Sequence, residues 1–404
     1  MNNQSAIDIL VLDDEPFMLK LLGRMLAGLG YTRVACHESG PAALAAHDAL
    51  GNAPDVILLD INMPGMDGVE FVRHLAQRHY PGGLILISGE DDRMLQATEK
   101  LARAYHLSVL GSLRKPPTPV GLSLLLDKWA PSAAEKSPAA NKTYDAEAVR
   151  AAIARGELVN YYQPKVVVAT GDVIGVETLV RWQHPEDGLV FPDRFIPVAE
   201  AHGLIGDVTR AVLKGALVQA KAWQDAGRAL SVAVNVSMDD LAALEFADFV
   251  VAETVAVGVL PQAVVLEVTE SRLMQSLATA LDVLTRLRLK RFRLSIDDFG
   301  TGHSSLAQLR DLPFDELKID RSFTRGAWQD ERLRAIFEAS LSLANQLGME
   351  VVAEGVEDAD DWAFLRQTGC HLGQGYFIAR PMPATALPGW LEDWRRRMKL
   401  APQN

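Results

Sequence analysis

The sequence predicts an α/β protein of two units, a small doubly wound parallel sheet followed by a modified (β/α)8 barrel. Three observations lead to this expectation. Short apolar runs alternate with amphipathic stretches, as is typical of strands buried on both faces between helices. A Pro-containing segment of small and polar residues at 130–142 interrupts the alternation and indicates a linker. After this segment, eight strand-like runs occupy about 260 residues, which is the usual size of an eight-stranded barrel.

The first unit, expected over residues 1–129, alternates five strand candidates with five helix candidates. The strand candidates are residues 7–14, 33–37, 56–60, 84–89 and 109–115. The helix candidates are residues 16–30, 40–50, 68–79, 91–106 and 119–129. Doubly wound sheets bind their ligands outside the carboxyl ends of the strands. We therefore expect the functional side chains of this unit at those strand ends.

The composition is that of an ordinary globular protein, with a formal charge of −12 over 404 residues. This charge disfavours binding to duplex nucleic acid, which draws on clustered Lys and Arg. Cys36 and Cys370 are the only cysteines, so neither a disulfide framework nor a zinc motif is indicated. No basic signal-peptide start is visible, and no run approaches the roughly twenty apolar residues of a membrane span. We expect a cytoplasmic protein without membrane insertion.

Polar residues follow the strands of the first unit. Asp13 and Asp14 end the first strand, and Asp60 ends the third. Ser88 ends the fourth strand, and Lys115 follows the fifth. Three acids at one edge of a sheet would repel one another, and Mg²⁺ is their natural neutraliser. A carboxylate beside Mg²⁺ can attack a phosphoryl group, whose oxygens a hydroxyl and an ammonium can hold. The pattern predicts a phosphorylation site with one Mg²⁺ ion.

The motifs LVLDDE, LLDINMPGMDG, ISG and KPP resemble those of the receiver domain of two-component response regulators. The resemblance implies that Asp60 is the phospho-acceptor and that a sensor histidine kinase or another phosphodonor is a partner. It also implies Mg²⁺ binding by the three acids and the Asn62 backbone, and phosphate sensing by Ser88 and Lys115. Ser112 stands three residues before Lys115, where receivers usually have Tyr or Phe, so the usual aromatic switch is doubtful. A receiver-like domain that is never phosphorylated is the alternative.

The second unit, expected over residues 143–404, carries acids near the ends of its strands. Its strand candidates are residues 158–168, 173–182, 230–237, 264–270, 292–300, 316–323, 350–357 and 372–381. The polar residues on them include Glu177, Asn235, Glu267, Glu270, Asp297, Asp298, Lys318, Asp320, Glu354 and Glu357. Burying a carboxylate is costly unless it meets a cation or a donor, and right-handed crossovers gather the strand ends on one face. Each acid alone could be a loop residue or a helix N-cap, but the whole set indicates a shared metal site.

Two further features complete the expected barrel. The first two strands flank a turn at Thr170–Gly171 and resemble a hairpin, so one strand of the barrel is expected to run antiparallel. The strongest helix candidates are residues 207–227 and 330–348, and the second of these ends at a Gly stop signal.

The ligand types in this unit favour Mg²⁺ or Mn²⁺ over zinc, because its carboxylates and an Asn amide offer oxygen atoms and no His or Cys lies inside the main acidic motifs. The adjacent Asp297 and Asp298 can bridge two cations, and a two-metal site stabilises the attacking and leaving oxygens of a phosphoryl displacement. Lys318 can add positive charge near the attacking water or the phosphate. Glu354 can accept a proton from that water if the geometry allows.

The motifs YYQPK, GVETLVRW, FIPVAE, NVS, LEVTES, DDFGTGHSSL, LKIDRSF, AEGVE and GQGYF resemble those of the EAL phosphodiesterase family, in the family's order. The resemblance covers about residues 143–395 and implies hydrolysis of cyclic di-GMP to linear pGpG on a modified (β/α)8 barrel. It implies two cations, Mg²⁺ or Mn²⁺. The first would be bound by Glu177, Asn235, Glu267 and Asp297, and the second by Asp297, Asp298 and Glu354.

The same resemblance assigns the remaining roles. Glu354 would be the general base, Lys318 would position the water, and Glu270 would brace the loop after DDFG. The implied substrate contacts are Gln163, Arg181, Asp320, Glu357 and Gln374. Thr178 replaces the Ala of the family's signature triplet and should not bind metal, because it points away from its neighbour Glu177 on the strand. His303 replaces a more usual Tyr, so regulation or turnover could differ.

The leading hypothesis is a response regulator whose output is cyclic di-GMP hydrolysis controlled at Asp60. The alternative is a weak or inactive barrel that senses cyclic di-GMP and acts through protein contacts. A DNA-binding regulator is a third class, but the second unit offers no helix-turn-helix and no basic patch. The resemblance makes a homodimer or a higher homo-oligomer the expected assembly.

Overall fold

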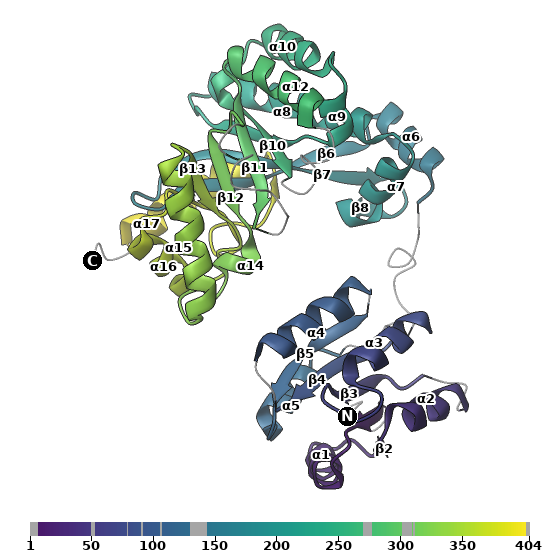
Figure 1. Ribbon diagram of the computed structural model, residues 1–404. Helices are drawn as coiled ribbons and strands as arrows, with labels where there is room; N and C mark the ends of the chain where they lie inside the picture. Colours follow the sequence, from purple (N-terminus) through teal and green to yellow (C-terminus); the bar gives the residue numbers. More distant parts are fainter. Residues whose placement is uncertain are drawn as a thin grey trace. The chain divides into compact units, whose positions relative to one another are not determined.

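The computed structural model describes residues 7–49, 53–78, 80–89, 92–105, 107–129, 144–269, 277–300, 309 and 312–400. The chain divides into two compact units, Met1–Pro138 and Ala139–Asn404, each with its own sheet (Figure 1). The expected linker at 130–142 lies outside the described residues. Among the described helices, none combines the length and the apolar character that a membrane crossing requires.

The first unit is a five-stranded parallel sheet with the strand order β2-β1-β3-β4-β5. Its strands are β1 (Asp8–Leu12), β2 (Arg33–His37), β3 (Val56–Asp60), β4 (Gly83–Ser88) and β5 (Ser108–Arg114). Its helices are α1 (Pro16–Gly28), α2 (Gly40–Ala49), α3 (Gly68–Gln77), α4 (Asp92–Ala104) and α5 (Pro119–Leu126). The order reverses beside β1, as in doubly wound folds.

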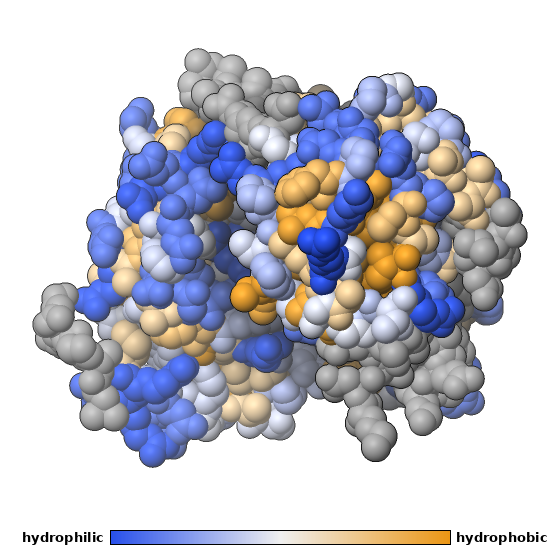
Figure 2. Space-filling model, turned by 90° about the horizontal axis from the view of Figure 1, so that it is seen from below, coloured by the Kyte–Doolittle hydropathy of each residue, from blue (hydrophilic) through white to orange (hydrophobic). Residues whose placement is uncertain are grey.

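The alternation of buried residues along each strand explains the two helical layers. Leu10 of β1 belongs to a buried cluster that includes residues of α2, α3 and α4, whereas Ile9 belongs to a second cluster, with residues of α1 and α5. Successive side chains of a strand point to opposite faces, so an apolar strand such as β3 contributes to both layers. The face of the molecule shown in Figure 2 is mainly polar, with apolar residues gathered in part of it. Phe17, Val120 and Leu124 are among the exposed apolar residues.

The second unit is a closed barrel. Its strands are β6 (Leu158–Val167), β7 (Val173–His184), β8 (Gly188–Val190), β9 (Ser231–Asn235), β10 (Val264–Thr269), β11 (Arg293–Phe299), β12 (Glu316–Ile319), β13 (Glu350–Ala353), β14 (Leu372–Gly373) and β15 (Met382–Pro383). They follow the order β15-β6-β14-β13-β12-β11-β10-β9-β7-β8, and a pairing between β6 and β7 closes the circle. Strand β6 runs antiparallel to both of its barrel neighbours, β7 and β14, which confirms the expected antiparallel strand.

Helices cover the outside of this barrel (Figure 1). They are α6 (Ala146–Arg155), α7 (Ile196–Ala201), α8 (Ile205–Asp225), α9 (Met238–Ala242), α10 (Phe246–Val257), α12 (Leu277–Leu289), α14 (Arg321–Thr324), α15 (Glu331–Gln346), α16 (Ala359–Thr368) and α17 (Leu387–Leu400), with short 3₁₀ turns at Pro192–Arg194 and Pro261–Ala263. The two strongest helix predictions correspond to α8 and α15. Both bury one apolar side, and Trp223 of α8 packs edge-on against Tyr162 of β6 with ring centroids 4.8 Å apart.

The last expected strand is much shorter than predicted, because β14 ends at Gly373. The chain then passes very close to a neighbouring loop at Gly375, where a Cβ atom would lie 2.2 Å from the carbonyl oxygen of Val356. Only glycine fits such an approach. The segment after β14 therefore forms a loop beside the AEGVE segment instead of continuing the strand.

Candidate active site

The barrel strands bring the expected acids to one region of its interior. Glu177 lies on β7, Asn235 ends β9, Glu267 lies on β10, and Asp297 lies on β11. Neighbouring strands hold them in register, since Asn235 is aligned with Glu267. Glu354 follows β13 directly. The polar residues that the sequence places on separate strands therefore lie close together in the folded barrel.

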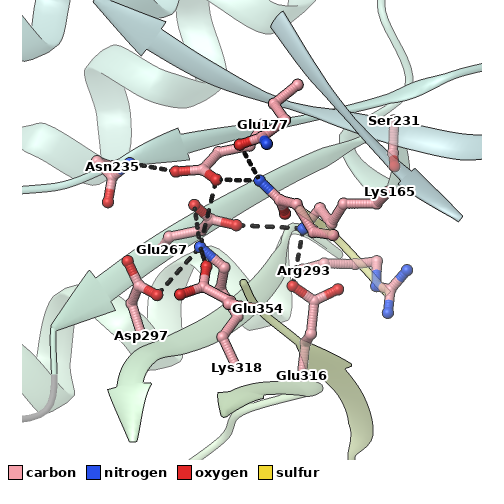
Figure 3. Close-up of polar contacts among 12 residues, drawn as sticks. Lys165, Glu177, Ser231, Asn235, Glu267, Arg293, Asp297, Glu316, Lys318 and Glu354 are labelled. Carbon is pink, nitrogen blue, oxygen red and sulfur yellow. Dashed lines mark hydrogen bonds and ion pairs between the residues drawn. The ribbon is translucent and has the colours of Figure 1, made fainter. Parts of the chain in front are cut away.

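Lys318 of β12 lies at the centre of these acids and is completely buried (Figure 3). Its Nζ atom is 2.7 Å from Oε1 of Glu354 and 3.0 Å from Oδ1 of Asp297. It is also 3.2 Å from Oε2 of Glu267 and 3.6 Å from Oε2 of Glu177. Burial alone would lower the pKa of Lys318, but the surrounding carboxylates raise it well above its usual range. The lysine is therefore a permanent cation that four carboxylates share.

One ammonium group does not balance so many acids. Burial, with a smaller contribution from nearby carboxylates, raises the pKa of Glu354 to about 8 and that of Glu267 to about 7, although Lys318 opposes both shifts. Burial and the adjacent Asp297 raise the pKa of Asp298 to about 6. A divalent cation would favour the ionised forms of these carboxyl groups and lower their pKa values, because it compensates negative charge in a low-dielectric interior.

The chemistry of the donors fits a hard divalent cation. Asp297, Asp298 and Glu354 each offer a carboxylate oxygen, and these oxygens lie within 4.8 Å of one another. Asp298 adopts a left-handed backbone conformation with a φ of 55°, which is uncommon for a residue other than glycine and is concentrated at functional sites. Asn235 donates its amide Nδ2 to Oε1 of Glu177 at 3.2 Å. All of these groups bring oxygen atoms, as Mg²⁺ and Mn²⁺ prefer.

Two glutamines connect the acids to the expected substrate side of the site. Gln374 donates from Nε2 to Oε2 of Glu177 at 2.5 Å and to Oε1 of Gln163 at 3.0 Å. Gln163 in turn donates to the carbonyl oxygen of Ala379 at 2.9 Å. Gln163 and Gln374 line a cavity of about 190 Å³ together with Glu177, Glu354, Glu357 and Tyr376. This cavity opens directly onto the carboxylate cluster.

A second cavity of about 480 Å³ is lined mostly by apolar surface. Asn235 and Asp298 contribute to its wall, and Leu179 borders both cavities. Thr178, which stands at the family's Ala position, also lines it. Its side chain is buried, and among the described residues its hydroxyl has no hydrogen-bond partner.

Three of the expected substrate contacts interact with other groups of the protein in this structure. The Arg181 guanidinium lies over the rings of Tyr161 and Phe191, with 5.6 and 5.0 Å to the centroids. Asp320 caps α14 by accepting a hydrogen bond from the backbone N–H of Ser322 at 2.9 Å. It is also close enough to Asp298 to contribute to the raised pKa of that group.

Glu357 lines the smaller cavity and also pairs with Arg325, with 3.1 Å between Nε and Oε2. Two other residues that the sequence singles out, Glu270 and His303, lie outside the described residues.

The prediction missed two buried charged residues beneath the acids, Lys165 of β6 and Glu316 of β12. Nζ of Lys165 is 3.1 Å from Oε1 of Glu267 and 2.9 Å from Oε1 of Glu316 (Figure 3). Burial would lower the pKa of Lys165 and raise that of Glu316, but the pairing overrides both effects and shifts each pKa the opposite way. Their spacing from residues that were predicted to lie in the site could have identified both of them. Lys165 lies two residues after Gln163, and Glu316 lies two before Lys318, so each shares a strand face with a predicted residue.

The first unit forms its own acidic site at the carboxyl ends of β1 and β3. Asp13, Asp14 and Asp60 offer oxygens within 4.8 Å of one another. Lys115 Nζ lies 2.7 Å from Oδ2 of Asp60 and 2.9 Å from Oδ2 of Asp13. Burial raises the pKa of Asp60, although the hydrogen bond from Lys115 opposes this shift. The arrangement of three oxygen donors suits one Mg²⁺ ion.

The other expected phosphate-site residues lie next to these acids. The backbone N–H of Asn62 donates to Oδ1 of Asp60 at 3.2 Å. Ser88 is fully buried at the end of β4, one residue after the register partner of Asp60. Ser112 lies within β5, as expected, and no aromatic ring occupies that position.

Comparison with known proteins shows that each of the two units matches a known domain family. The family model for the EAL domain matches residues 146–381, and the model for the response regulator receiver domain matches residues 9–122. The cyclic di-GMP phosphodiesterase RocR of Pseudomonas aeruginosa is 32% identical over 380 residues, which cover 93% of this chain and 96% of RocR. MucR of the same organism, a bifunctional diguanylate cyclase/cyclic di-GMP phosphodiesterase, is 42% identical over 245 residues, which are 59% of this chain and 35% of MucR.

Solved structures of similar proteins agree with the match to the EAL domain family. The PaMucR phosphodiesterase in complex with c-di-GMP matches with a TM-score of 0.57 and 42% identity, over 60% of this chain and 98% of that one. The EAL enzyme Bd1971, in its cAMP- and cyclic-di-GMP-bound form, matches with a TM-score of 0.58 and 29% identity, over 61% and 67% of the two chains. The chain therefore belongs to the EAL domain family and carries a response regulator receiver domain ahead of its EAL domain.

Proposed function

We propose that this protein is a response regulator that hydrolyses cyclic di-GMP to linear 5′-pGpG, under the control of phosphorylation at Asp60. The single observation that carries the proposal is the site around Lys318, where Glu177, Glu267, Asp297 and Glu354 meet one ammonium group. RocR, a phosphodiesterase by name, matches nearly the whole chain, including both units.

The residues of the site fit a pair of Mg²⁺ or Mn²⁺ ions. Glu177, Asn235, Glu267 and Asp297 would hold one ion, and Asp297, Asp298 and Glu354 would hold the other. When bound, such a pair supplies Lewis-acid stabilisation of the attacking and leaving oxygens of an in-line displacement.

The protein groups would carry the proton and orient the reactants. Glu354 would accept a proton from the attacking water, because it lies at the edge of the cavity and beside Lys318. Lys318 would orient that water and add positive charge. The water oxygen forms a bond to one phosphorus, the bond from that phosphorus to the ribose O3′ breaks, and the O3′ atom takes up a proton. The product carries a 5′-phosphate and a free 3′-hydroxyl.

The two cavities support a substrate with two bases. The carboxylate cluster contributes Glu177 and Glu354 to the smaller cavity and Asn235 and Asp298 to the larger one. A cyclic dinucleotide would place its phosphates over the cluster and reach into both cavities. Gln163, Arg181, Asp320, Glu357 and Gln374 remain the proposed substrate contacts.

The direct test incubates the purified full-length chain with cyclic di-GMP and Mg²⁺ or Mn²⁺ and separates the products by chromatography. We expect pGpG from the parent chain and none from Glu354→Ala at matched protein concentration. Turnover retained by Glu354→Ala would overturn the assignment of the base. Binding of cyclic di-GMP by the parent without any pGpG would instead identify a sensor module.

We also propose that the receiver acts as the switch. Asp60 would attack a phosphoryl group from a sensor histidine kinase or a small phosphodonor, with one Mg²⁺ beside Asp13 and Asp14. The cytoplasm as the site of action and a homodimer or higher homo-oligomer as the assembly stay predictions.

A further inference from the structure

We propose that Lys165, anchored by Glu316, is a positioning residue that fixes the orientation of Glu267 toward the metal site. This inference rests on the proposed metal site and adds two residues to it. Neither residue belongs to the proposed ligands, base or substrate contacts.

The two oxygens of Glu267 have different partners. Oε1 accepts from Nζ of Lys165 at 3.1 Å, and Oε2 accepts from Nζ of Lys318 at 3.2 Å. Lys318 also contacts Asp297 and Glu354, so Oε2 faces the carboxylate cluster while Oε1 faces away from it (Figure 3). A carboxylate held in this way cannot rotate freely, and it offers one oxygen to a cation.

Lys165 can act as a fixed anchor because it is itself held in place. Its Nζ lies 2.9 Å from Oε1 of Glu316, and both side chains are almost completely inaccessible to solvent. They come from different strands, β6 and β12, so the barrel wall sets their separation. Glu316 also balances the charge of Lys165, so the pair adds no net charge beneath the acids. An uncompensated lysine at this depth would be costly.

The energetic argument favours a functional role for the pair. A buried ion pair is often no more stabilising than well-packed apolar residues of similar volume, so stability alone gives little reason for it. Side chains that orient a metal ligand have a measurable effect, since their loss typically weakens metal affinity or activity by about 10- to 100-fold.

The test measures Mn²⁺ affinity directly, by calorimetry and by electron paramagnetic resonance, on the full-length chain. Asp14→Asn and Asp60→Asn are present in every sample, so that the receiver contributes no Mn²⁺ signal. The test variant is Lys165→Met with Glu316→Gln, which removes both charges together. The matched control is Lys214→Met with Glu253→Gln, which removes an ion pair between α8 and α10 of the same unit that involves neither the Lys165–Glu316 pair nor any proposed metal ligand.

We expect the Lys165/Glu316 double variant to bind Mn²⁺ at least about tenfold more weakly and the control to bind it as the parent does. A melting temperature near that of the parent would show that the loss is not due to unfolding. If the double variant does not fold, Glu316→Gln alone keeps Lys165 but removes its anchor, and weaker Mn²⁺ binding is again expected.

Unchanged Mn²⁺ affinity in a folded test variant, with normal binding by the parent, would overturn the positioning role and leave the proposed function intact. Absence of Mn²⁺ binding by the parent would overturn the metal site itself and this inference with it.

Discussion

Nζ of Lys318 lies 2.7 Å from Oε1 of Glu354 inside the barrel, and this ion pair joins the proposed base to a cation that also contacts Glu177, Glu267 and Asp297. The pair has two consequences. In the absence of metal, the lysine holds the acidic cluster together. With metal bound, the same lysine would keep positive charge beside the proposed base, where the attacking water would be placed.

Replacing Lys318 by methionine should destabilise the metal-free protein by about 3–5 kcal/mol, because buried carboxylates lose their partner. Mg²⁺ should restore part of this loss by supplying positive charge to the same acids. Urea unfolding with EDTA and with Mg²⁺ measures both effects. Lys214→Met is the control, since Lys214 pairs with Glu253 at an exposed position and should cost less than about 1 kcal/mol. Equal losses in the two variants would contradict the central role of Lys318.

The stability of the metal-free protein should fall as the pH rises from about 5 to about 8. The pKa values of Asp298, Glu267 and Glu354 are raised to about 6, 7 and 8, so in this window the folded state holds protons that the unfolded state has released. The free energy of unfolding then decreases with increasing pH. Thermal unfolding across this range in EDTA measures the slope.

Two comparisons test whether these carboxyl groups cause the change of the free energy of unfolding with pH. Saturating Mg²⁺ should flatten it, because the cation replaces the protons in the folded state. Glu354→Gln should reduce it in EDTA, because one of the titrating groups is gone. A slope that stays the same in both cases would place the titration elsewhere in the molecule.

Asp60→Asn should abolish phosphoryl transfer to the protein, because the amide is not a nucleophile for this chemistry. Labelled acetyl phosphate with Mg²⁺ measures incorporation, and beryllofluoride serves as the phosphate mimic. We expect beryllofluoride to change the rate of cyclic di-GMP hydrolysis in the parent and not in Asp60→Asn. Identical rates with and without beryllofluoride in the parent would remove the switch while leaving the hydrolase proposal unaffected.

Thr178→Val should raise the free energy of unfolding by about 1 kcal/mol, because it replaces a buried hydroxyl that has no partner among the described residues with a methyl group of similar size. The variant should still hydrolyse cyclic di-GMP, since Thr178 does not join the acids, and any change should appear in KM because Thr178 lines the larger cavity. The control is Thr254→Val, which removes a buried hydroxyl that donates to the carbonyl oxygen of Val250 at 2.7 Å. That change should be destabilising. Chemical denaturation that ranks the two variants in the reverse order would refute the prediction.

The fold and the acids of the site follow from regular features of the sequence. Strands such as β3 are continuous apolar runs, and acids such as Glu267 stand out within them, because a carboxylate in a buried strand needs a partner. The antiparallel β6 could be predicted from the turn at Thr170–Gly171, since a short turn can join only antiparallel neighbours.

Other parts of the site depend on distant contacts that spacing along the chain does not reveal. The pairing of Lys165 with Glu316 joins residues 151 positions apart in the sequence. Asp320 lies in a predicted strand, yet it caps α14, because β12 ends one residue earlier. The early end of β14 depends on the close approach of Gly375 to Val356, a tertiary contact. These features are set by how the strands meet when the barrel closes.

The position of two inward-facing residues on the single strand β6 has a consequence for how this site can change. Gln163, a proposed substrate contact, and Lys165, which holds Glu267, are carried by the same strand two residues apart, and both point inward. Inserting or deleting one residue before Gln163 in β6 would turn both side chains outward together. The proposed substrate contact and the proposed orientation of the metal ligand are thus coupled through this strand, so substitutions in β6 could change one without the other, whereas a shift of its register would disturb both.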